Sequence, residues 1–296
     1  MSDAVTIYLE PQMRRSAEAG AHNFIGKIEA VLGRAGCAVR FADEEERFNH
    51  GAGRALVHMK PPMSADTLVI RRVYAYPFWA IEASEKRWEW DVAQARFEAE
   101  SVPPRKAARF AESWRRRMFG EAVPGRDGYV YIPLQGRIRE RRSFQAASSL
   151  EMIEAVLAHD TRRDVVIGMH PKERYDAADI DALEKFEHRF DRVSVVMGQM
   201  ERLLPRCDYV VSQNSAAAFF GFFFEKPCAL FGKIDFHHIA ANVHELGTDE
   251  ALRLVPDLRP DFARYLWWFW QERSINAGRP EAEDVIAARL RRFGWM

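Results

Sequence analysis

Short apolar runs alternate with helix-like patterns along most of the chain. In the first half, residues 5–9 and 37–41 are predicted strands, and the apolar positions of residues 22–32 recur between them at helical spacing. Two further apolar runs of strand length follow at residues 55–59 and 67–73. A strand–helix–strand order favours parallel pairing, so we expect this half to form a parallel sheet.

The second half repeats this alternation more regularly. Its predicted strands are separated by predicted helices, at the spacing of a doubly wound, Rossmann-like domain. The strands cover residues 129–134, 165–169, 193–197, 209–212 and 228–231, and the helices cover residues 148–159, 178–190, 200–204 and 215–223. The predicted fold class is therefore α/β, with two Rossmann-like domains.

A charged segment separates the two halves. Residues 82–119 have a helical pattern with a break at Pro103-Pro104, and residues 120–128 carry three glycines and a proline. A stretch rich in glycine and proline is typical of a linker, so we expect a domain boundary near residue 124.

Three regions follow from that boundary. We expect an N-terminal domain over residues 1–124, with residues 82–119 as a helical insertion. A second domain is expected over residues 125–259. Residues 260–296 are expected to add two C-terminal helices, the first of which contains a run of tryptophan and other aromatic residues.

Composition and charge narrow the class of protein. Hydrophobic residues make up 48% of the chain, and the 43 Lys and Arg residues balance the 43 Asp and Glu residues. A balanced charge gives no support to a nucleic-acid partner, because such proteins usually carry a basic excess. Basic clusters at residues 105–117 and 137–142 are best interpreted as solvated faces, with an anionic substrate or lipid headgroups as the alternative.

Three cysteines without a C-x-x-C pair indicate buried thiols in a reducing compartment. The first residues lack a secretory pattern, so a cytoplasmic protein is expected, with the inner face of the inner membrane as a second location.

Polar residues gather where the predicted strands of the second half end. Gln135 follows the first strand, His170 and Lys172 follow the second, and the run Ser-Gln-Asn-Ser at residues 212–215 follows the fourth. Ligands of open parallel sheets bind outside the carboxyl ends of the strands. These clusters therefore predict a site for one anionic ligand, although each has a plain structural reading as a strand end or a helix cap.

Other polar positions carry weaker signals. Glu225 follows the helix at residues 215–223, and either hydrogen-bonds a ribose or lies in a polar turn. The pair Asp179 and Asp181 lies at a helix start, where acidic residues are favoured without any metal. His237 and His238 are adjacent and have no zinc-like partners in sequence, so no metal site is expected.

Three stretches carry a resemblance to a known family. YIPLQ, IGMHPK and YVVSQNSAAAFFGFFFEKPCALFG, within residues 129–240, resemble the capsule polysaccharide biosynthesis proteins, which include bacterial β-Kdo transferases. Bacterial sialyltransferases have a similar His-Pro and serine arrangement. The resemblance implies a GT-B fold, in which two Rossmann-like domains face a cleft and the terminal helices pack back on the first domain.

The resemblance also implies chemistry. It predicts a metal-independent, inverting glycosyltransferase that uses a nucleotide sugar, with a CMP-Kdo-like donor favoured. The predicted acceptor is a glycan or glycolipid. The resemblance also allows peripheral association with a membrane. His170 would contact the phosphate of CMP. The rest of that site would comprise Ser212, Asn214 and Ser215.

A transferase also needs a general base for the acceptor hydroxyl, and this base is expected from the N-terminal domain. Glu10 and His22 are the preferred residues, and Asp43 and Glu82 are the others near strand ends. Two alternatives stay open: a non-catalytic GT-B-like module that binds a glycan or a partner, and a sugar-nucleotide epimerase.

Overall fold

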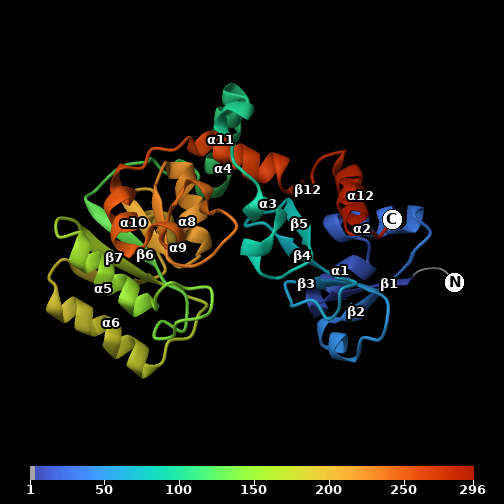
Figure 1. The fold of residues 1–296 in the computed structure, drawn as a ribbon, viewed down its shortest axis with the longest axis horizontal. Helices are drawn as coiled ribbons and strands as arrows, with labels where there is room; N and C mark the ends of the chain where they lie inside the picture. Colours follow the sequence, from blue (N-terminus) through green and yellow to red (C-terminus); the bar gives the residue numbers. More distant parts are fainter. Residues whose placement is uncertain (1–3) are drawn as a thin grey trace. The chain divides into compact units, whose positions relative to one another are not determined.

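The computed structural model describes residues 4–296 and divides the chain into two compact units (Figure 1). Unit 1 runs to Ala95 and resumes over Trp268–Met296, whereas unit 2 is the continuous segment Arg96–Trp267. The first boundary lies well before the expected position near residue 124. The chain therefore leaves unit 1 once and returns to it near its C-terminus.

Unit 1 is built on a six-stranded sheet with the order β12-β5-β4-β3-β1-β2. Strands β1 to β4 pair in parallel, and β5 and β12 are antiparallel to their neighbours. The strands are β1 (Ala4–Leu9), β2 (Ala38–Asp43), β3 (Arg54–His58), β4 (Thr67–Arg72), β5 (Phe78–Glu82) and β12 (Ile275–Asn276). The helices are α1 (Pro11–Glu18), α2 (Asn23–Arg34), α3 (Asp91–Gln94) and α12 (Ala282–Arg292).

One face of this sheet carries the larger core of unit 1. Apolar residues of β1, β3, β4 and β5 pack there with helix α2 and with α12, which comes from the C-terminal segment. Ile275, Ile286 and Leu290 are completely buried in that core. The C-terminal segment therefore completes unit 1, which explains why it belongs to this unit.

The expected helical insertion at residues 82–119 is wrong in its first part. Residues 78–82 form the buried strand β5, and short 3-10 turns with the four-residue α3 occupy the chain up to Ser101. Only α4 (Pro104–Phe119) is a long helix. Its Phe110 ring lies 5.4 Å from Trp267, and its Phe119 ring lies 4.9 Å from Phe224. These aromatic contacts place α4 in unit 2, and they account for the early boundary.

Unit 2 is built on a parallel six-stranded sheet with the order β11-β10-β9-β6-β7-β8. The strands are β6 (Tyr129–Pro133), β7 (Asp164–Met169), β8 (Val193–Met197), β9 (Tyr209–Ser212), β10 (Cys228–Leu230) and β11 (Ala241–Asn242). The helices besides α4 are α5 (Ser149–His159), α6 (Ala177–Arg189), α7 (Met200–Leu203), α8 (Ala216–Gly221), α9 (Val243–Leu246), α10 (Thr248–Leu254) and α11 (Phe262–Trp267). The predicted strands of this half nearly coincide with those observed.

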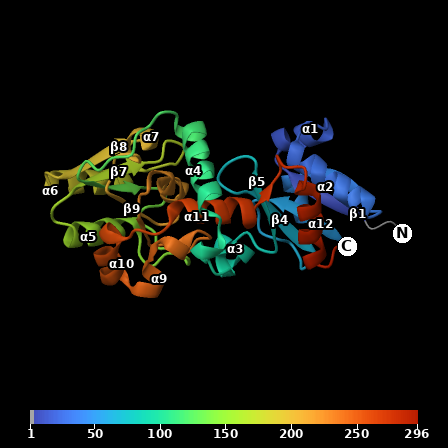
Figure 2. The same cartoon turned by 90° about the horizontal axis from the view of Figure 1, so that it is seen from above.

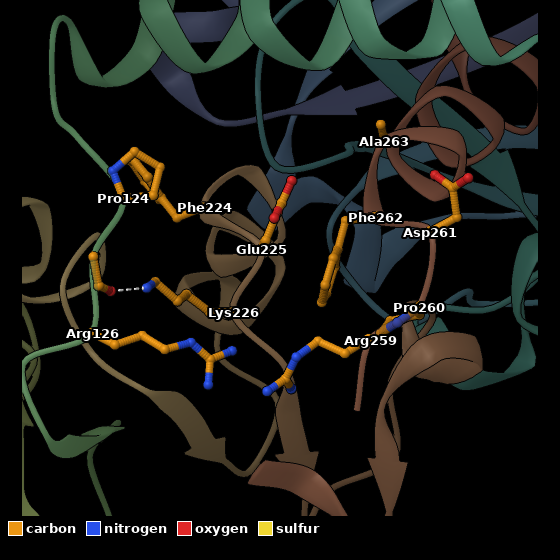
Figure 3. Close-up of a pocket in the computed structure, with 11 residues that line it drawn as sticks. Pro124, Arg126, Phe224, Glu225, Lys226, Arg259, Pro260, Asp261, Phe262 and Ala263 are labelled. Atoms are coloured by element: carbon orange, nitrogen blue, oxygen red, sulfur yellow. Dashed lines mark hydrogen bonds between the residues drawn. The ribbon is translucent and has the colours of Figure 1, made fainter. Parts of the chain in front are cut away.

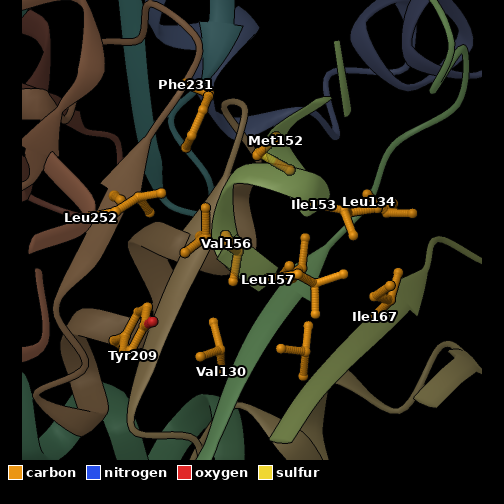
Figure 4. Packing of buried hydrophobic residues seen from close by; sticks show 14 of the residues in the cluster. Val130, Leu134, Met152, Ile153, Val156, Leu157, Ile167, Tyr209, Phe231 and Leu252 are labelled. Atoms are coloured by element: carbon orange, nitrogen blue, oxygen red, sulfur yellow. The ribbon is translucent and has the colours of Figure 1, made fainter. Parts of the chain in front are cut away.

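Helices cover both faces of this sheet (Figure 2). On one face, α5, α6 and α10 pack against alternate residues of the central strands. Figure 4 shows this packing, in which Val130, Ile167 and Tyr209 lie beneath Ile153 and Val156 of α5. A strand buried on both faces is typical of a parallel sheet. Within residues 4–296 no helix combines the length and the apolar character needed to cross a bilayer.

Candidate functional site

The strand order of unit 2 contains a topological switch point between β6 and β9. Counted from β6 as the first strand, the order is 6-5-4-1-2-3, which is the Rossmann order. The chain moves outward from β6 in one direction and from β9 in the other, so the loops that follow these two strands diverge. Ligands of this fold bind in the crevice that such loops leave at the carboxyl edge. Gln135 and Gln213 lie in these two loops.

His170 lies at the same edge, directly after the neighbouring strand β7. Its backbone N–H donates to the Tyr175 hydroxyl at 2.9 Å, and its Nδ1 accepts the backbone N–H of Lys172 at 3.2 Å. The side chain is exposed, and its Nε2 has no hydrogen-bond partner among residues 4–296. The ring is thus held in place by one nitrogen, which leaves the other available to a ligand.

The loops after β6 and β7 approach each other closely. A Cβ atom on Gly136 would lie 2.6 Å from the Glu173 Oε2 atom and 3.4 Å from the Arg174 carbonyl oxygen. A side chain at position 136 would therefore displace the Glu173 carboxylate. Gln135 is half-buried beside Gly136 and makes no side-chain hydrogen bond in the described chain. The structure thus brings Gln135 and the His170 loop together.

The serines after β9 organise the backbone. Ser212 is completely buried and its hydroxyl accepts the backbone N–H of Ser215 at 3.2 Å. The Ser215 hydroxyl in turn accepts the N–H of Ala217 at 3.2 Å and caps α8. Asn214 lies between them, half-buried, and its amide makes no hydrogen bond within the described residues. The serines shape this loop, and Asn214 is the residue whose polar group is left for a ligand.

Two glutamines beside this loop carry unpaired polar atoms. Gln213 and Gln145 are each 4% exposed, and the Oε1 atom of the first and the Nε2 atom of the second find no partner in residues 4–296. Gln145 pairs with Gly232, whose N–H donates to the Gln213 carbonyl at 2.9 Å. Both amides are therefore at the ends of β9 and β10. An unpaired buried polar atom costs free energy, so these two amides are candidates for a polar partner from outside the described chain.

The basic run after β6 is partly neutralised. Arg137 pairs with Glu140, and Arg139 pairs with Asp179 at 2.7 Å, so these two cations have structural partners. Arg141 and Arg142 instead donate to the Gln145 backbone carbonyl and side chain at 3.4 Å. Both remain without a carboxylate partner in the described chain, and they add positive charge near the unpaired glutamines.

Glu225 is not brought together with the other predicted residues. It follows α8 and precedes β10, so it lies at the amino edge of the sheet, whereas the residues above lie at the carboxyl edge. Figure 3 shows it in a pocket with Lys226 and Arg126. The sequence interpretation offered Glu225 as a ribose contact because acidic residues have that role in nucleotide-binding folds. Helix α8 instead carries the chain across the sheet, from the edge of the serines to the edge of Glu225.

Unit 1 holds a second polar group at the carboxyl edge of its own sheet. The centre of the His22 ring lies 5.6 Å from the centre of the Trp79 indole. The centre of the His58 ring lies 6.3 Å from the same indole. Trp79 also stacks on Phe24 at 4.6 Å, which fixes its plane. Its Nε1 donor is buried without a partner among residues 4–296. The indole therefore connects two imidazoles from different elements.

Burial and positive charge keep both histidines neutral. Burial lowers the pKa of His58 to about 4, and the charges of Arg71 and Arg72 add to that effect. Burial likewise lowers the pKa of His22, with Arg72 acting in the same direction. A neutral imidazole near pH 7 can accept a proton or donate a hydrogen bond.

The other predicted bases lie elsewhere in unit 1. Glu10 is exposed after β1, and no hydrogen bond or ion pair in residues 4–296 joins its carboxylate to the histidines. Asp43 caps the 3-10 turn after β2 through a capping box. Glu82 ends the antiparallel strand β5, which places it at the opposite edge of the sheet from His58. It is buried there against Arg289 at 3.5 Å. His22 is thus the predicted base that the structure groups with other polar side chains.

Comparison with known proteins bears on the fold. No protein-family model matches the chain, and no curated protein matches it. Among solved structures, it is similar to the beta Kdo 2,7 transferase of Thermosulfurimonas dismutans KpsC, with 15% identity over 97% of this chain and 99% of that chain and a TM-score of 0.51. The chain has a GT-B-like fold. This confirms the predicted fold class, and it confirms the resemblance to capsule polysaccharide biosynthesis proteins at the level of the fold.

Two further solved structures match at lower TM-scores. The beta Kdo 2,4 transferase of the same KpsC is 12% identical over 90% of this chain and 89% of that chain, with a TM-score of 0.45. A UDP-GlcNAc 2-epimerase of Methanocaldococcus jannaschii is 10% identical over 99% of this chain and 100% of that chain, with a TM-score of 0.32.

Three residues of these groups were missed by the sequence interpretation. His58 was included in a predicted strand, and neither Trp79 nor Gln145 was among the candidate donor-site or base residues. Only His58 had a sequence signal, because a histidine at the end of a buried strand lies where ligands bind. Among residues 4–296, no three His, Cys, Asp or Glu side chains converge as a metal site would require.

Proposed function

We propose that the chain is a glycosyltransferase of surface-polysaccharide synthesis, and that its nucleotide-sugar donor binds at the carboxyl edge of unit 2. The observation that carries this proposal is the set of unpaired polar atoms at the switch point between β6 and β9. These atoms belong to His170, Asn214, Gln145 and Gln213. A CMP-linked, Kdo-like donor is favoured by the family resemblance of the strand-end residues.

The proposed chemistry centres on the leaving phosphate. The carboxyl ends of β7 and β9 are separated by β6, so His170 and Ser212 lie roughly 10 Å apart, a span that a nucleotide phosphate and ribose can bridge. His170 would donate its Nε2–H to the phosphate, and the exposed Lys172 ammonium would balance the charge. Such donors can stabilise the leaving group without a metal ion. Metal independence is therefore part of the proposal.

The acceptor hydroxyl must lose a proton during transfer, and we assign that step to the histidines of unit 1. His58 and His22 are both neutral near pH 7, as a general base must be. Glu10 is no longer the preferred partner of His22, because His58 is the residue that shares the Trp79 indole. The acceptor in this proposal is a glycan or glycolipid.

A thermal-shift screen of CMP, CDP, UMP, UDP, GDP and ADP tests the donor site. A ligand that binds only the folded state raises the melting temperature. Stabilisation by CMP that is lost in His170→Ala supports a CMP-sugar donor. Stabilisation by UDP or GDP alone supports the same binding site but indicates a UDP- or GDP-sugar donor instead. Absence of any shift contradicts the donor site and favours a non-catalytic module.

A transfer assay then separates the enzyme classes. We expect sugar transfer from CMP-Kdo to a glycan acceptor in the presence of excess EDTA, with at least a hundredfold loss in His58→Gln, because general bases contribute on the order of 10² to 10⁴ in rate. The anomeric configuration of the product, read by NMR, tests the expected inversion. Consumption of a UDP-sugar without an acceptor would identify an epimerase instead.

A further inference from the structure

A second polar pocket lies at the amino edge of the unit 2 sheet. Its walls come from three segments: residues 124–126 before β6, residues 224–226 before β10, and residues 259–263 at the start of α11. The pocket has a volume of about 620 Å³. Since the proposed donor site lies at the carboxyl edge, this pocket is a separate feature of the same unit.

Three cationic side chains line this pocket. Figure 3 shows the guanidinium groups of Arg126 and Arg259 pointing toward one another, with the Lys226 side chain alongside Arg126. Arg126 has no hydrogen bond or ion pair within residues 4–296. Within the described residues, Arg259 donates only to the carbonyls of Pro256 and Leu258, at 2.9 and 2.7 Å. The two guanidinium groups therefore face each other without a carboxylate between them.

The two acidic residues of the pocket do not neutralise these cations. In Figure 3 the Glu225 carboxylate points away from both guanidinium groups. Asp261 is held by Arg264, whose Nε lies 3.4 Å from the carboxylate and whose backbone N–H donates to it at 2.9 Å. The positive charge of this pocket is thus left uncompensated by its own walls.

The burial of Lys226 makes the absence of a counter-charge in this pocket unfavourable in free energy. The residue is 2% exposed, and its ammonium group donates to the Gly125 carbonyl, which is a neutral acceptor. Burial lowers the pKa of the Lys226 ammonium, and the nearby charge of Arg126 acts in the same direction. Buried charges are usually paired, because desolvation without a counter-charge is unfavourable.

The loop that carries Arg126 is held in a fixed position. Arg206 forms an ion pair with Asp127 and covers Gly125, where a Cβ atom would lie 2.3 Å from the guanidinium. The N–H of Gly125 also donates to the Pro205 carbonyl at 3.0 Å. Arg126 therefore projects from a fixed backbone, and little ordering is needed for it to bind an anion.

We propose that this pocket binds an anionic phosphate group, clamped between the guanidinium groups of Arg126 and Arg259. Two facing guanidinium forks match the oxygen geometry of phosphate and diphosphate groups. The ligand is the phosphate portion of a soluble phosphate compound or of a phospholipid headgroup. This site is independent of the donor site and does not rest on the proposed glycosyl transfer.

Titration calorimetry with inorganic pyrophosphate tests the site in the full-length chain. We expect binding that weakens about tenfold or more in Arg126→Gln and in Arg259→Gln, because each removes charge-assisted hydrogen bonds. The matched control is Arg189→Gln, an exposed arginine at the end of α6 in the same unit, which should bind as the wild type does. Each titration is repeated with the donor site saturated with CMP, which should leave pyrophosphate binding at this pocket unchanged.

A second experiment distinguishes a phospholipid headgroup from a soluble phosphate compound. Flotation with vesicles that contain phosphatidylglycerol, compared with phosphatidylcholine alone, shows a lipid headgroup site if Arg126→Gln and Arg259→Gln lose binding and Arg189→Gln does not. Loss of pyrophosphate binding in the same two variants, without vesicle binding, identifies a soluble phosphate compound. The proposal is overturned if neither probe binds, or if both variants bind like the control. Circular dichroism of each variant confirms that it is folded.

Discussion

The backbone N–H of Lys172 donates to the Nδ1 atom of His170 over 3.2 Å, so the neutral imidazole carries its proton on Nε2. This relationship converts a histidine at a strand end into an oriented hydrogen-bond donor. The Pro171 between the two residues restricts the backbone of the same turn. The geometry thus separates a structural role for one ring nitrogen from a ligand-binding role for the other.

Two substitutions at this position should give different results. In His170→Asn the amide oxygen can still accept the Lys172 N–H, but the outward donor is lost. We expect the melting temperature of the free protein to stay close to that of the wild type, and the affinity for the stabilising nucleotide to fall about tenfold. Calorimetry measures the affinity, and unchanged nucleotide binding in His170→Asn would remove His170 from the donor site.

The loop after β9 allows structure and binding to be separated. Ser215→Ala removes the cap of α8, so we expect the free energy of unfolding to fall by about 1 kcal/mol, as is typical for caps. Asn214→Ala breaks no hydrogen bond in the described chain, and should change stability by less than about 0.5 kcal/mol. Urea denaturation measures both. We expect Asn214→Ala to weaken nucleotide binding severalfold, and equal binding by this variant and the wild type would contradict that role.

His58 should make the protein sensitive to acid. Burial lowers its pKa from 6.5 to about 4, so the unfolded chain binds a proton more readily than the folded chain between these pH values. The stability due to neutral His58 is complete above pH 6.5, and it is lost as the pH falls toward 4. We expect His58→Gln to lose less free energy of unfolding than the wild type over that range, by up to about 3 kcal/mol. Parallel pH profiles of the two proteins would argue against a buried, neutral His58.

Glu82 should act in the opposite sense. Burial raises the pKa of its carboxyl to about 7, although Arg289 opposes that change. The folded state therefore holds this proton more tightly than the unfolded state, and its contribution to stability is lost as the pH rises from 4.5 through 7. We expect Glu82→Gln to gain up to about 3 kcal/mol relative to the wild type when the pH is raised from 5 to 8. Urea titrations at both pH values test this, and a variant that becomes relatively less stable at pH 8 would show that Arg289 dominates.

Much of the fold was predictable from the sequence because, in unit 2, the local sequence patterns agree with the secondary structure that forms. Its strands are β-branched runs bounded by turns, and its helices begin at capping residues such as Ser148 and Asp176. Strand β5 was not predicted: it pairs antiparallel with β4 on one side, and its other partner, β12, comes from a segment nearly two hundred positions later, beyond unit 2. The unit boundary was missed for a related reason. The ring contacts of Phe110 and Phe119 that hold α4 in unit 2 are tertiary contacts, which the sequence does not reveal. The glycine-rich stretch shows only where the chain can turn.

The same distinction between local and tertiary features applies to the candidate sites. A residue that directly follows a predicted strand, such as His170 or Asn214, can be placed at a sheet edge from the sequence. Glu225 could not, because its edge depends on the direction of the helix before it. The neutrality of His58 and the unpaired Nε2 atom of Gln145 depend on burial and on neighbours from distant segments. Such properties appear only when the tertiary structure is known.

The interruption of unit 1 has a consequence for biosynthesis. A ribosome synthesises the whole of unit 2 before it adds Ile275 and Ile286, which belong to the core of unit 1. Until then, strand β5 has an open edge, and the apolar face of helix α2 lacks its covering helix α12. Domains tend to fold in the order in which they emerge. Here that order is inverted, since the first segment of unit 1 is synthesised before unit 2 but unit 1 is completed after it. Nascent unit 1 is therefore the part of this protein that a chaperone would have reason to protect.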